Sequence, residues 1–268
     1  MTGPEKVAEF GPCKVVILAG GFGTRLAERT DEMPKPMVQV GGRPILWHIM
    51  KIFSHFGFND FLIACGYRGD AITRFFLEYR EQMSDHLFDF ANNQMTRINE
   101  KIEPWRVACI DTGAETMTGG RVKRIGGYAG DDTFMLTYGD GVCDVDLRKV
   151  LAFHKKHGKA ATFTAVRAPM PFGYAELDGD RVKCFLEKPR EVNSWINGGF
   201  MAVEARVLDR INGDMTNFEI EVLPTLARDG ELMAYKHEGF WHAMDTLRDV
   251  RNLNAMWNEG KAKWKVWR

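Results

Sequence analysis

The sequence predicts an α/β fold: a Rossmann-like mixed, mainly parallel sheet flanked by helices, with a small antiparallel part and a helical tail. Short aliphatic and β-branched runs alternate with segments of helical period through the first half, which is typical of βαβ units. A glycine-rich turn directly follows the first of these runs. After Ala160, short strands separated by turns at 178–180, 197–199 and 212–214 indicate an antiparallel or mixed second half.

Each element is expected from its own pattern. We expect strands at 14–18, 60–65, 106–111 and 133–138, helices over 45–53 and 70–79, and a tail helix after Thr246. Residues 81–104 are polar and lack a clean period, which predicts a long excursion of the kind that forms lids or subunit contacts. Since no repeat or Pro/Ser-rich linker divides the chain, we expect a disordered extension at 1–12 and one domain over 13–268, with halves at about 13–150 and 151–268.

The composition limits the possible partners. Of the 268 residues, 45% are hydrophobic, and 36 Lys and Arg balance 36 Asp and Glu. This balance argues against nucleic acid or an anionic membrane as the main partner, but it permits a local basic pocket for a small phosphorylated ligand. No apolar stretch approaches the ~20 residues of a membrane span. The 5 cysteines form no CxxC pair and indicate reduced, mostly buried thiols of a cytoplasmic protein.

The strongest local signal is the segment LAGGFGTRL at 18–26. Gly20, Gly21 and Gly23 remove the Cβ atoms that would keep backbone N–H groups away from a phosphate, and Arg25 can neutralise its charge. The segment is not a Walker A loop, because Gly-Lys-Ser/Thr is missing, nor a Rossmann fingerprint, because Leu26 replaces the third glycine. Shortly afterwards, Lys35 lies between two prolines that restrict its backbone.

Several motifs occur in the order found in sugar nucleotidyltransferases, and on them the sequence resembles that family over nearly everything after Cys13. They are GGFGTRL (20–26), PKPM (34–37), YGDG (138–141), EKP (187–189) and NGGF (197–200). The similarity is greatest to the branch of the family that uses CTP and glucose 1-phosphate. It rests on GGRPILWH (41–48), EPW (103–105), DTG (111–113), MTGGR (117–121), FW (240–241), MDTLRD (244–249) and WKVW (264–267).

The resemblance implies the nucleotide-diphospho-sugar transferase fold, in which the small antiparallel part binds the sugar. It also implies transfer of a cytidylyl group from CTP to α-D-glucose 1-phosphate, giving CDP-glucose and pyrophosphate for deoxysugar or surface-polysaccharide synthesis. Alternatives are another nucleotide or another phosphorylated acceptor, a non-catalytic nucleotide or sugar-phosphate sensor, and a DxD glycosyltransferase. The expected transfer brings two anions together, so it depends on positioning and on charge neutralisation by lysine, arginine and Mg²⁺.

Roles follow from the resemblance residue by residue. Arg25, Lys35 and Asp140 are expected to be catalytic, and Asp140 and Asp245 to bind Mg²⁺. The alternatives are that Asp140 caps a turn and that Asp245 is the N-cap of the tail helix. Nucleotide binding is assigned to Leu18, Ala19, Gly20, Gly21, Phe22, Gly23, Thr24, Arg25, Lys35, Gly139 and, in a base-reading loop over 111–121, Thr116, Gly120 and Arg121. Sugar-phosphate binding is assigned to Glu187, Lys188, Asn197 and Gly198.

Other patterns favour structural roles. Asp144 and Asp146 form a DxD pattern, but two acids before a helix indicate capping more often than metal binding. His154 and His157 lie at helical spacing and predict a solvated face. The Trp-rich tail is expected to dock into a core or a subunit interface. The excursion at 81–104 and this tail together favour a homo-oligomer.

Overall fold

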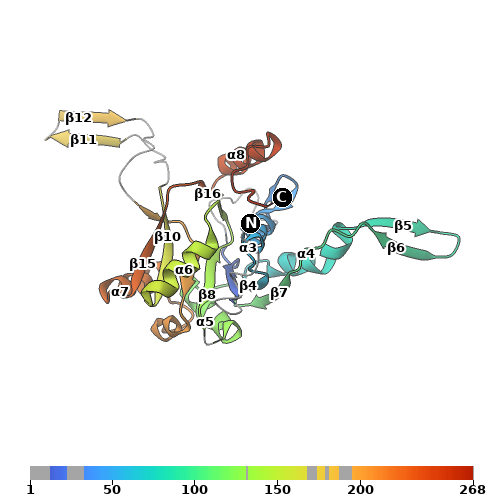
Figure 1. The fold of residues 1–268 in the computed structure, drawn as a ribbon, viewed down its shortest axis with the longest axis horizontal. Coiled ribbons are helices and arrows are strands. Elements are labelled where there is room, and N and C mark those ends of the chain that lie inside the picture. Colours follow the sequence, from blue (N-terminus) through green and yellow to red (C-terminus); the bar gives the residue numbers. More distant parts are fainter. Residues whose placement is uncertain are drawn as a thin grey trace.

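A sheet of eight strands forms the centre of the molecule (Figure 1). The structure is a computed structural model that describes residues 13–22, 33–130, 132–167, 174–178, 181–186 and 195–267. The expected extension at 1–12 lies outside these residues. The sheet order is β13 (Ile196–Asn197), β10 (Ala161–Val166), β14 (Met201–Val203), β8 (Phe134–Tyr138), β1 (Val15–Leu18), β4 (Asp60–Cys65) and β7 (Arg106–Asp111), and β15 (Leu232–His237) pairs with β10.

Most neighbours in the sheet are parallel. β1 pairs in parallel with β4 and β8, and β4 with β7, whereas β14 runs antiparallel to β8 and β10. All four side chains of β1 are buried, as expected for a central parallel strand covered on both faces. The expected mixed, mainly parallel sheet is confirmed.

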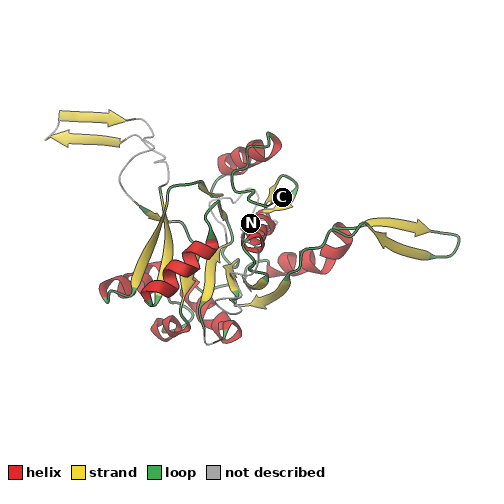
Figure 2. Ribbon diagram, in the orientation of Figure 1, coloured by secondary structure: helices red, strands yellow, loops and turns green. Residues whose placement is uncertain are grey.

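Helices cover both faces of the sheet (Figure 2). Val15 and Ile17 of β1 pack in one core with α3, α6 and α8, and Val16 and Leu18 pack in a second core with α5, η3, η4 and α7. The helices are α3 (Ile45–His55), α4 (Gly69–Gln82), α5 (Thr118–Ala129), α6 (Leu147–His157), α7 (Leu223–Arg228), α8 (Leu247–Asn258), the 3₁₀ helices η2 (Lys35–Met37) and η3 (Ala205–Arg210), and the π-helix η4 (Phe218–Val222). No described helix has the length and apolar character that a membrane crossing requires.

Four two-stranded antiparallel sheets supplement the central one. They are β2 (Gln39–Val40) with β3 (Arg43–Pro44), β5 (Asp85–Asp89) with β6 (Gln94–Ile98), β9 (Gly141–Cys143) with β16 (Trp241–Ala243), and β11 (Tyr174–Asp178) with β12 (Arg181–Leu186). The β5–β6 hairpin forms most of the expected excursion at 81–104 and projects from the body beyond α4 (Figure 1).

The tail docks into the core of the same chain. Trp264 is fully buried, and its indole Nε1 donates a hydrogen bond to Nδ1 of His48 at 3.3 Å. His48 in turn makes a 2.8 Å hydrogen bond through Nε2 to the carbonyl of Val40, and Trp257 and Trp267 pack against its ring.

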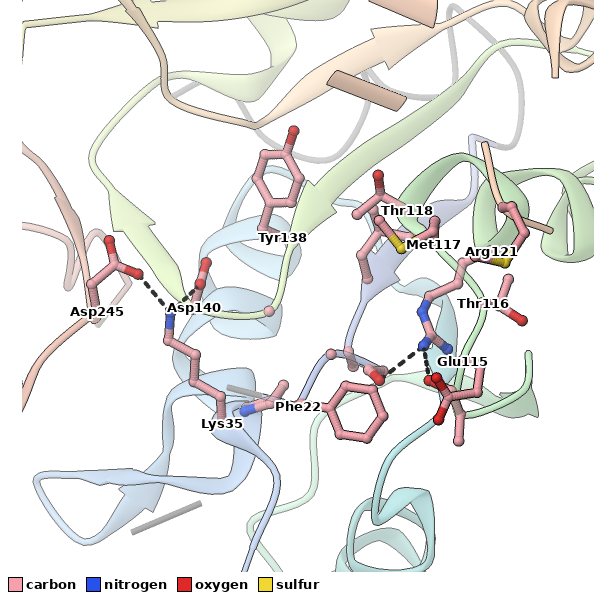
Figure 3. Close-up of a pocket in the computed structure, with 18 residues that line it drawn as sticks. Phe22, Lys35, Glu115, Thr116, Met117, Thr118, Arg121, Tyr138, Asp140 and Asp245 are labelled. Carbon is pink, nitrogen blue, oxygen red and sulfur yellow. Dashed lines mark hydrogen bonds and ion pairs between the residues drawn. The ribbon is translucent and has the colours of Figure 1, made fainter. Parts of the chain in front are cut away.

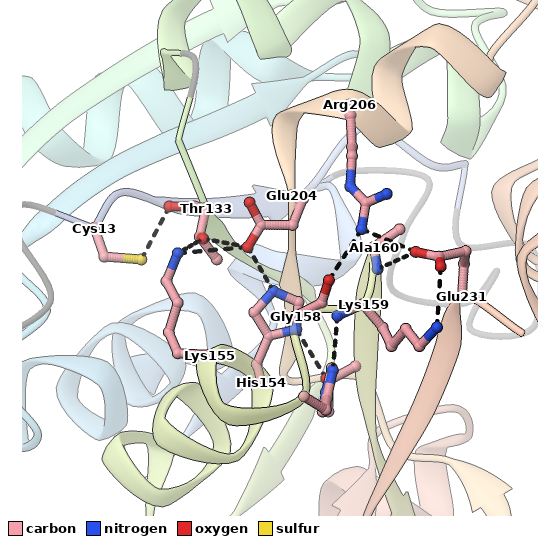
Figure 4. Close-up of polar contacts among 12 residues, drawn as sticks. Cys13, Thr133, His154, Lys155, Gly158, Lys159, Ala160, Glu204, Arg206 and Glu231 are labelled. Atoms are coloured by element: carbon pink, nitrogen blue, oxygen red, sulfur yellow. Dashed lines mark hydrogen bonds and ion pairs between the residues drawn. The ribbon is translucent and has the colours of Figure 1, made fainter.

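A polar cluster lies where the N-terminal ends of β1 and β8 meet (Figure 4). His154 is fully buried and bonds Glu204 at 2.9 Å and Thr162 at 2.9 Å. The expected solvated face is therefore wrong for His154, because that residue continues the buried stripe of Leu147, Val150 and Leu151 along α6.

The DxD pattern has the structural role that its sequence favours. Asp146 is the N-cap of α6 and accepts hydrogen bonds from the N–H groups of Arg148 and Lys149. Asp144 accepts a 2.7 Å bond from the N–H of Phe240. Cys13, Cys65 and Cys143 are free and buried, as expected.

Candidate active site

A cavity of about 510 Å³ opens where the carboxyl ends of β1 and β8 lie side by side, with Leu18 opposite Tyr138 (Figure 3). Open α/β sheets bind their ligands at this edge, and the volume suits a small-molecule ligand. The lining residues are Leu18, Ala19, Gly20, Gly21, Phe22, Lys35, Pro36, Ala114, Glu115, Thr116, Met117, Thr118, Arg121, Tyr138, Gly139, Asp140, Met215 and Asp245.

The β9–β16 ladder brings the two predicted metal-binding carboxylates together. Asp140 immediately precedes β9, Asp245 follows β16, and Gly141 pairs with Ala243. The N–H of Met244 donates a 2.9 Å hydrogen bond to the carbonyl of Asp140. Asp245 is not the N-cap of α8, because Thr246 takes that role in a capping box with Asp249.

Lys35 lies between these carboxylates. Its Nζ donates to Oδ2 of Asp140 at 2.6 Å and to Oδ1 of Asp245 at 2.7 Å, and its side chain is 13% exposed. Burial by itself would lower the pKa of Lys35, but the two ion pairs outweigh it and raise the pKa above that of a free lysine. The ammonium group is therefore fixed in its charged form at the cavity wall.

A close backbone contact holds the Lys35 segment in place. A Cβ on Gly139 would lie 2.8 Å from Cγ of Pro36 and 2.9 Å from the carbonyl oxygen of Leu18, so only glycine fits there. The N–H of Gly139 also donates to the carbonyl of Leu18 at 2.9 Å. The glycine turn, the lysine and Asp140 are thus positioned by one another.

Arg121 braces the opposite wall of the cavity. Its two terminal nitrogens donate to the carbonyl oxygens of Gly20, Cys65, Gly113 and Ala114 and to Oγ1 of Thr112, at 2.7–3.2 Å. A Cβ on Gly20 would lie 2.2 Å from this guanidinium, which explains the requirement for glycine. Both terminal nitrogens already bond protein acceptors in this structure.

The expected base-reading loop over 111–121 is shorter than predicted, because α5 begins at Thr118 and contains Gly120 and Arg121. Gly120 and Gly119 let the chain at 214–216 lie directly on the first turn of α5. A Cβ on Gly120 would lie 2.4 Å from the carbonyl oxygen of Asp214, and one on Gly119 would lie 2.7 Å from that of Thr216. Thr116 lines the cavity and is buried.

The expected sugar-phosphate residues are described in part. Asn197 donates through Nδ2 to the hydroxyl of Tyr138 at 3.1 Å, and Gly198 accepts a 2.8 Å bond from Nε1 of Trp241. Neither residue is among those that line the cavity. Gly23, Thr24, Arg25, Glu187 and Lys188 lie outside the described residues.

Sequence reasoning missed several residues that the structure brings to the site. Glu115, Met117, Thr118, Tyr138 and Met215 line the cavity. Met117 and Thr118 stand within the motif MTGGR and Tyr138 within YGDG, so the sequence offered a signal for these three. Met215 comes from a loop whose place follows only from tertiary packing.

Fold and site together define an α/β protein with a lysine and two carboxylates beside a cavity at the carboxyl edge of its sheet. The sequence profile described as "Nucleotidyl transferase" matches residues 14–262, so the chain belongs to the nucleotidyl transferase family.

Curated relatives match along almost the whole chain. The chain is 51% identical to "Glucose-1-phosphate cytidylyltransferase" of Salmonella typhi, over 95% of this chain and 99% of that one. It is 41% identical to "Probable glucose-1-phosphate cytidylyltransferase" of Bacillus subtilis, over 95% of this chain and 100% of that one. The solved structure of HddC from Yersinia pseudotuberculosis, at 22% identity, superposes with a TM-score of 0.64 over 91% of this chain and 99% of its own, which supports the fold.

Proposed function

We propose that this protein transfers a cytidylyl group from CTP to α-D-glucose 1-phosphate, forming CDP-glucose and pyrophosphate. The 51% identity to a relative with that activity in its name supports the choice of substrates. The observation that carries the chemistry is the Lys35 ammonium group, held between Asp140 and Asp245 at the cavity wall. The product would feed deoxysugar or surface-polysaccharide synthesis.

The transfer is an in-line displacement at the α-phosphorus of CTP. An oxygen of the sugar phosphate forms the new P–O bond, and the bond to the β-phosphate breaks with pyrophosphate leaving. Lys35 offsets the charge that builds on the α-phosphate, and the N–H groups of Gly20 and Gly21 face the triphosphate. Arg25 neutralises the leaving pyrophosphate, Lys188 binds the sugar's phosphate beside Glu187, and Asn197 with Gly198 completes the sugar subsite. We assign recognition of the base to Thr116, which lines the cavity, and to Gly120 and Arg121 in the first turns of α5.

Asp140 and Asp245 fit Mg²⁺. Both carboxylates approach one cationic group, the Lys35 ammonium, within 2.7 Å, so their oxygens converge on a common point. Among the described residues no cluster of three or more His, Cys, Asp or Glu side chains could hold a metal ion. Two carboxylates completed by phosphate oxygens and water are the usual ligands of Mg²⁺, which would supply further charge neutralisation when bound.

Pyrophosphate release tests the proposal. The protein is incubated with Mg²⁺ and glucose 1-phosphate, and CTP, UTP, dTTP, GTP and ATP are compared at equal concentration. We expect release with CTP, and its loss when EDTA removes the metal ion. A second panel exchanges glucose 1-phosphate for other hexose 1-phosphates. Release with a different nucleotide or acceptor alone would overturn the substrate assignment, and binding of CTP without any turnover would indicate a sensor.

We further propose a cytoplasmic homo-oligomer. Free thiols at Cys13, Cys65 and Cys143 support a reducing compartment. The β5–β6 hairpin exposes a run of apolar side chains that a second copy of the chain would cover: Leu87, Phe88, Phe90, Met95 and Ile98.

A further inference from the structure

Glu219 joins two walls of the cavity through its carboxylate. Its Oε1 accepts a hydrogen bond from the hydroxyl of Tyr138 at 2.7 Å, and its Oε2 accepts one from Oγ1 of Thr118 at 2.6 Å. Tyr138 lies at the end of β8, two residues before Asp140, and Thr118 is the first residue of α5. Both line the cavity, so one side chain spans from the carboxylate strand to the proposed base-recognition wall.

The backbone around Glu219 is held by an N-capped π-helix. It lies in the first turn of η4, a π-helix whose N-cap Asn217 accepts hydrogen bonds from the N–H groups of Glu219 and Ile220. π-helical turns are rare and occur often at functional sites. The glycines at the start of α5 let the chain at 214–216, which precedes η4, pack closely on that helix. This packing sets Glu219 beside Thr118.

The direction of every hydrogen bond in this network is fixed. Asn197 donates through Nδ2 to the hydroxyl of Tyr138, and its Oδ1 accepts from the N–H of Gly199. The tyrosine hydroxyl must then donate its own proton to Glu219. Thr118 accepts from the N–H of Phe218 at 2.9 Å and likewise donates to Glu219. The carboxylate is therefore the final acceptor of two arms, one from Asn197 and one from the start of α5.

Attraction to a phosphorylated substrate does not explain why a carboxylate stands at position 219. No described cation forms an ion pair with it, and a carboxylate beside a cavity for two phosphorylated substrates disfavours their binding. The carboxylate is explained by its role as acceptor for the hydroxyl groups of Tyr138 and Thr118. An ionised acceptor forms stronger hydrogen bonds than a neutral one and so holds both hydroxyl groups in fixed directions.

We infer that Glu219 is a positioning residue that orients Tyr138 and Asn197 toward the sugar phosphate through one arm and α5 toward the nucleotide through the other. The inference rests on the proposed function for the identity of the two substrates. The two arms meet only at the carboxylate, so they can be cut separately. Tyr138→Phe cuts the Asn197 arm, Thr118→Val cuts the α5 arm, and Glu219→Gln disturbs both.

Glutamine is a poor replacement for Glu219, because it has one acceptor oxygen where the carboxylate has two. Its oxygen can accept from Tyr138, but its NH₂ group then faces Thr118. Oγ1 of Thr118 already accepts from Phe218, and its own proton loses the Glu219 acceptor. The substitution therefore keeps the volume of the side chain and breaks the direction of the network.

Steady-state kinetics with both substrates varied tests the inference. We expect Tyr138→Phe to raise KM for glucose 1-phosphate on the order of tenfold and KM for CTP by less than about twofold, and Thr118→Val to do the reverse, in line with loss of one hydrogen bond to a charged group. Glu219→Gln should raise both. Two conservative variants serve as controls: Tyr128→Phe, on the exposed side of α5, and Glu221→Gln, which lies in the same π-helix and, within the described part of the chain, accepts only from the N–H of Asn217.

The outcomes distinguish a positioning role of Glu219 from an effect on the stability of the fold. Melting temperatures and circular dichroism establish that each variant is folded. Equal KM changes for both substrates in the two single-arm variants, or no change in either KM, would overturn the inference. If the wild-type protein releases no pyrophosphate from CTP and glucose 1-phosphate, the proposed function fails by itself. The same variants are then compared by calorimetric affinity for CTP and for glucose 1-phosphate, where loss of the substrate-selective pattern would again overturn the inference.

Discussion

At the scale of single residues, Asp140 makes the sharpest prediction. Asp140→Asn keeps the shape of the side chain but removes the charge that pairs with Lys35 at 2.6 Å. We expect kcat to fall by at least about a hundredfold, the size of effect seen when one charge-stabilising group is removed from an active site. The exposed Asp132, at the opposite end of β8, provides the matched control Asp132→Asn. An unchanged kcat in a folded Asp140→Asn protein would remove this residue from the site.

A pair of glycines tests how tightly the site is positioned. Gly139→Ala places a Cβ 2.8 Å from Pro36, whereas Gly141→Ala meets nothing closer than 3.8 Å. We expect Gly139→Ala to displace the Lys35 segment, to lower kcat/KM at least about tenfold, and to destabilise the fold by about 2 kcal/mol. Gly141→Ala should behave as wild type in both kinetics and thermal melting. Similar behaviour of the two variants would show that the close contact does not position Lys35.

The residues of the site differ in how far they could be predicted. Lys35, Asp140 and Asp245 stand in short motifs with definite chemistry, and the structure brings their side chains together. Glu219 carries no such motif, and its link to Tyr138 spans 81 residues of sequence. Arg121 was expected in a loop, but it lies inside α5 with its terminal nitrogens bonded to backbone carbonyls and Thr112. Such long-range contacts are set by packing, which no local pattern records.

At the scale of elements, His48 on α3 packs against the docked tail and makes the stability of the fold depend on pH. Burial removes the His48 ring from water and lowers its pKa to about 4, although the hydrogen bond from Nε2 to the carbonyl of Val40 opposes this shift. Nδ1 of the neutral ring accepts from Trp264 of the tail. In the unfolded chain its pKa is about 6.5, so below that value the unfolded state binds more protons. The stabilisation is complete above about pH 6.5 and is lost as the pH falls toward 4, by up to about 3 kcal/mol.

Chemical denaturation between pH 4 and 7 measures this effect. The free energy of unfolding of wild type should fall more steeply with decreasing pH than that of His48→Gln, which cannot bind a proton. Other histidines and the carboxylates titrate in both proteins, so the difference between the two curves isolates His48. Parallel curves would contradict the role given to its buried, neutral form.

The predictability of the elements follows the clarity of the apolar pattern in their sequences. The bounds expected for β4 and β7, 60–65 and 106–111, agree with the structure, because each strand is a short apolar run within a parallel sheet. No helix was expected over α5, because its sequence TGGRVKRIGGYA holds four glycines, which weaken a helical signal. The β5–β6 hairpin gave no clear period because its side chains are mostly exposed and no core selects one face.

At the scale of the whole molecule, we propose that 13–268 form one domain. The central sheet takes β1, β4, β7 and β8 from the first half and β10, β13, β14 and β15 from the second. The carboxylates of the site also come from both halves, since Asp140 and Asp245 are joined through the β9–β16 ladder. Separation of the halves would break the sheet between β8 and β14 and divide the site.

The projecting hairpin carries the last prediction, on assembly. Phe88 and Phe90 stack with ring centroids 6.3 Å apart and are 59% and 91% exposed, so their apolar surface contributes little to the stability of the single chain. We expect the wild-type protein to form an oligomer in which this surface is covered. Phe88→Ser with Phe90→Ser should shift light-scattering mass toward the monomer while leaving the melting of the single chain nearly unchanged.

A matched control is Tyr128→Ser, which removes a 56% exposed aromatic side chain from α5 without touching the hairpin. It should leave the mass unaltered. If wild type is a monomer at micromolar concentration, or if the double serine variant keeps the wild-type mass, the hairpin does not join copies of the chain. Its apolar face would then require a different protein to cover it, because an exposed run of this kind is a liability for a chain that stays alone in solution.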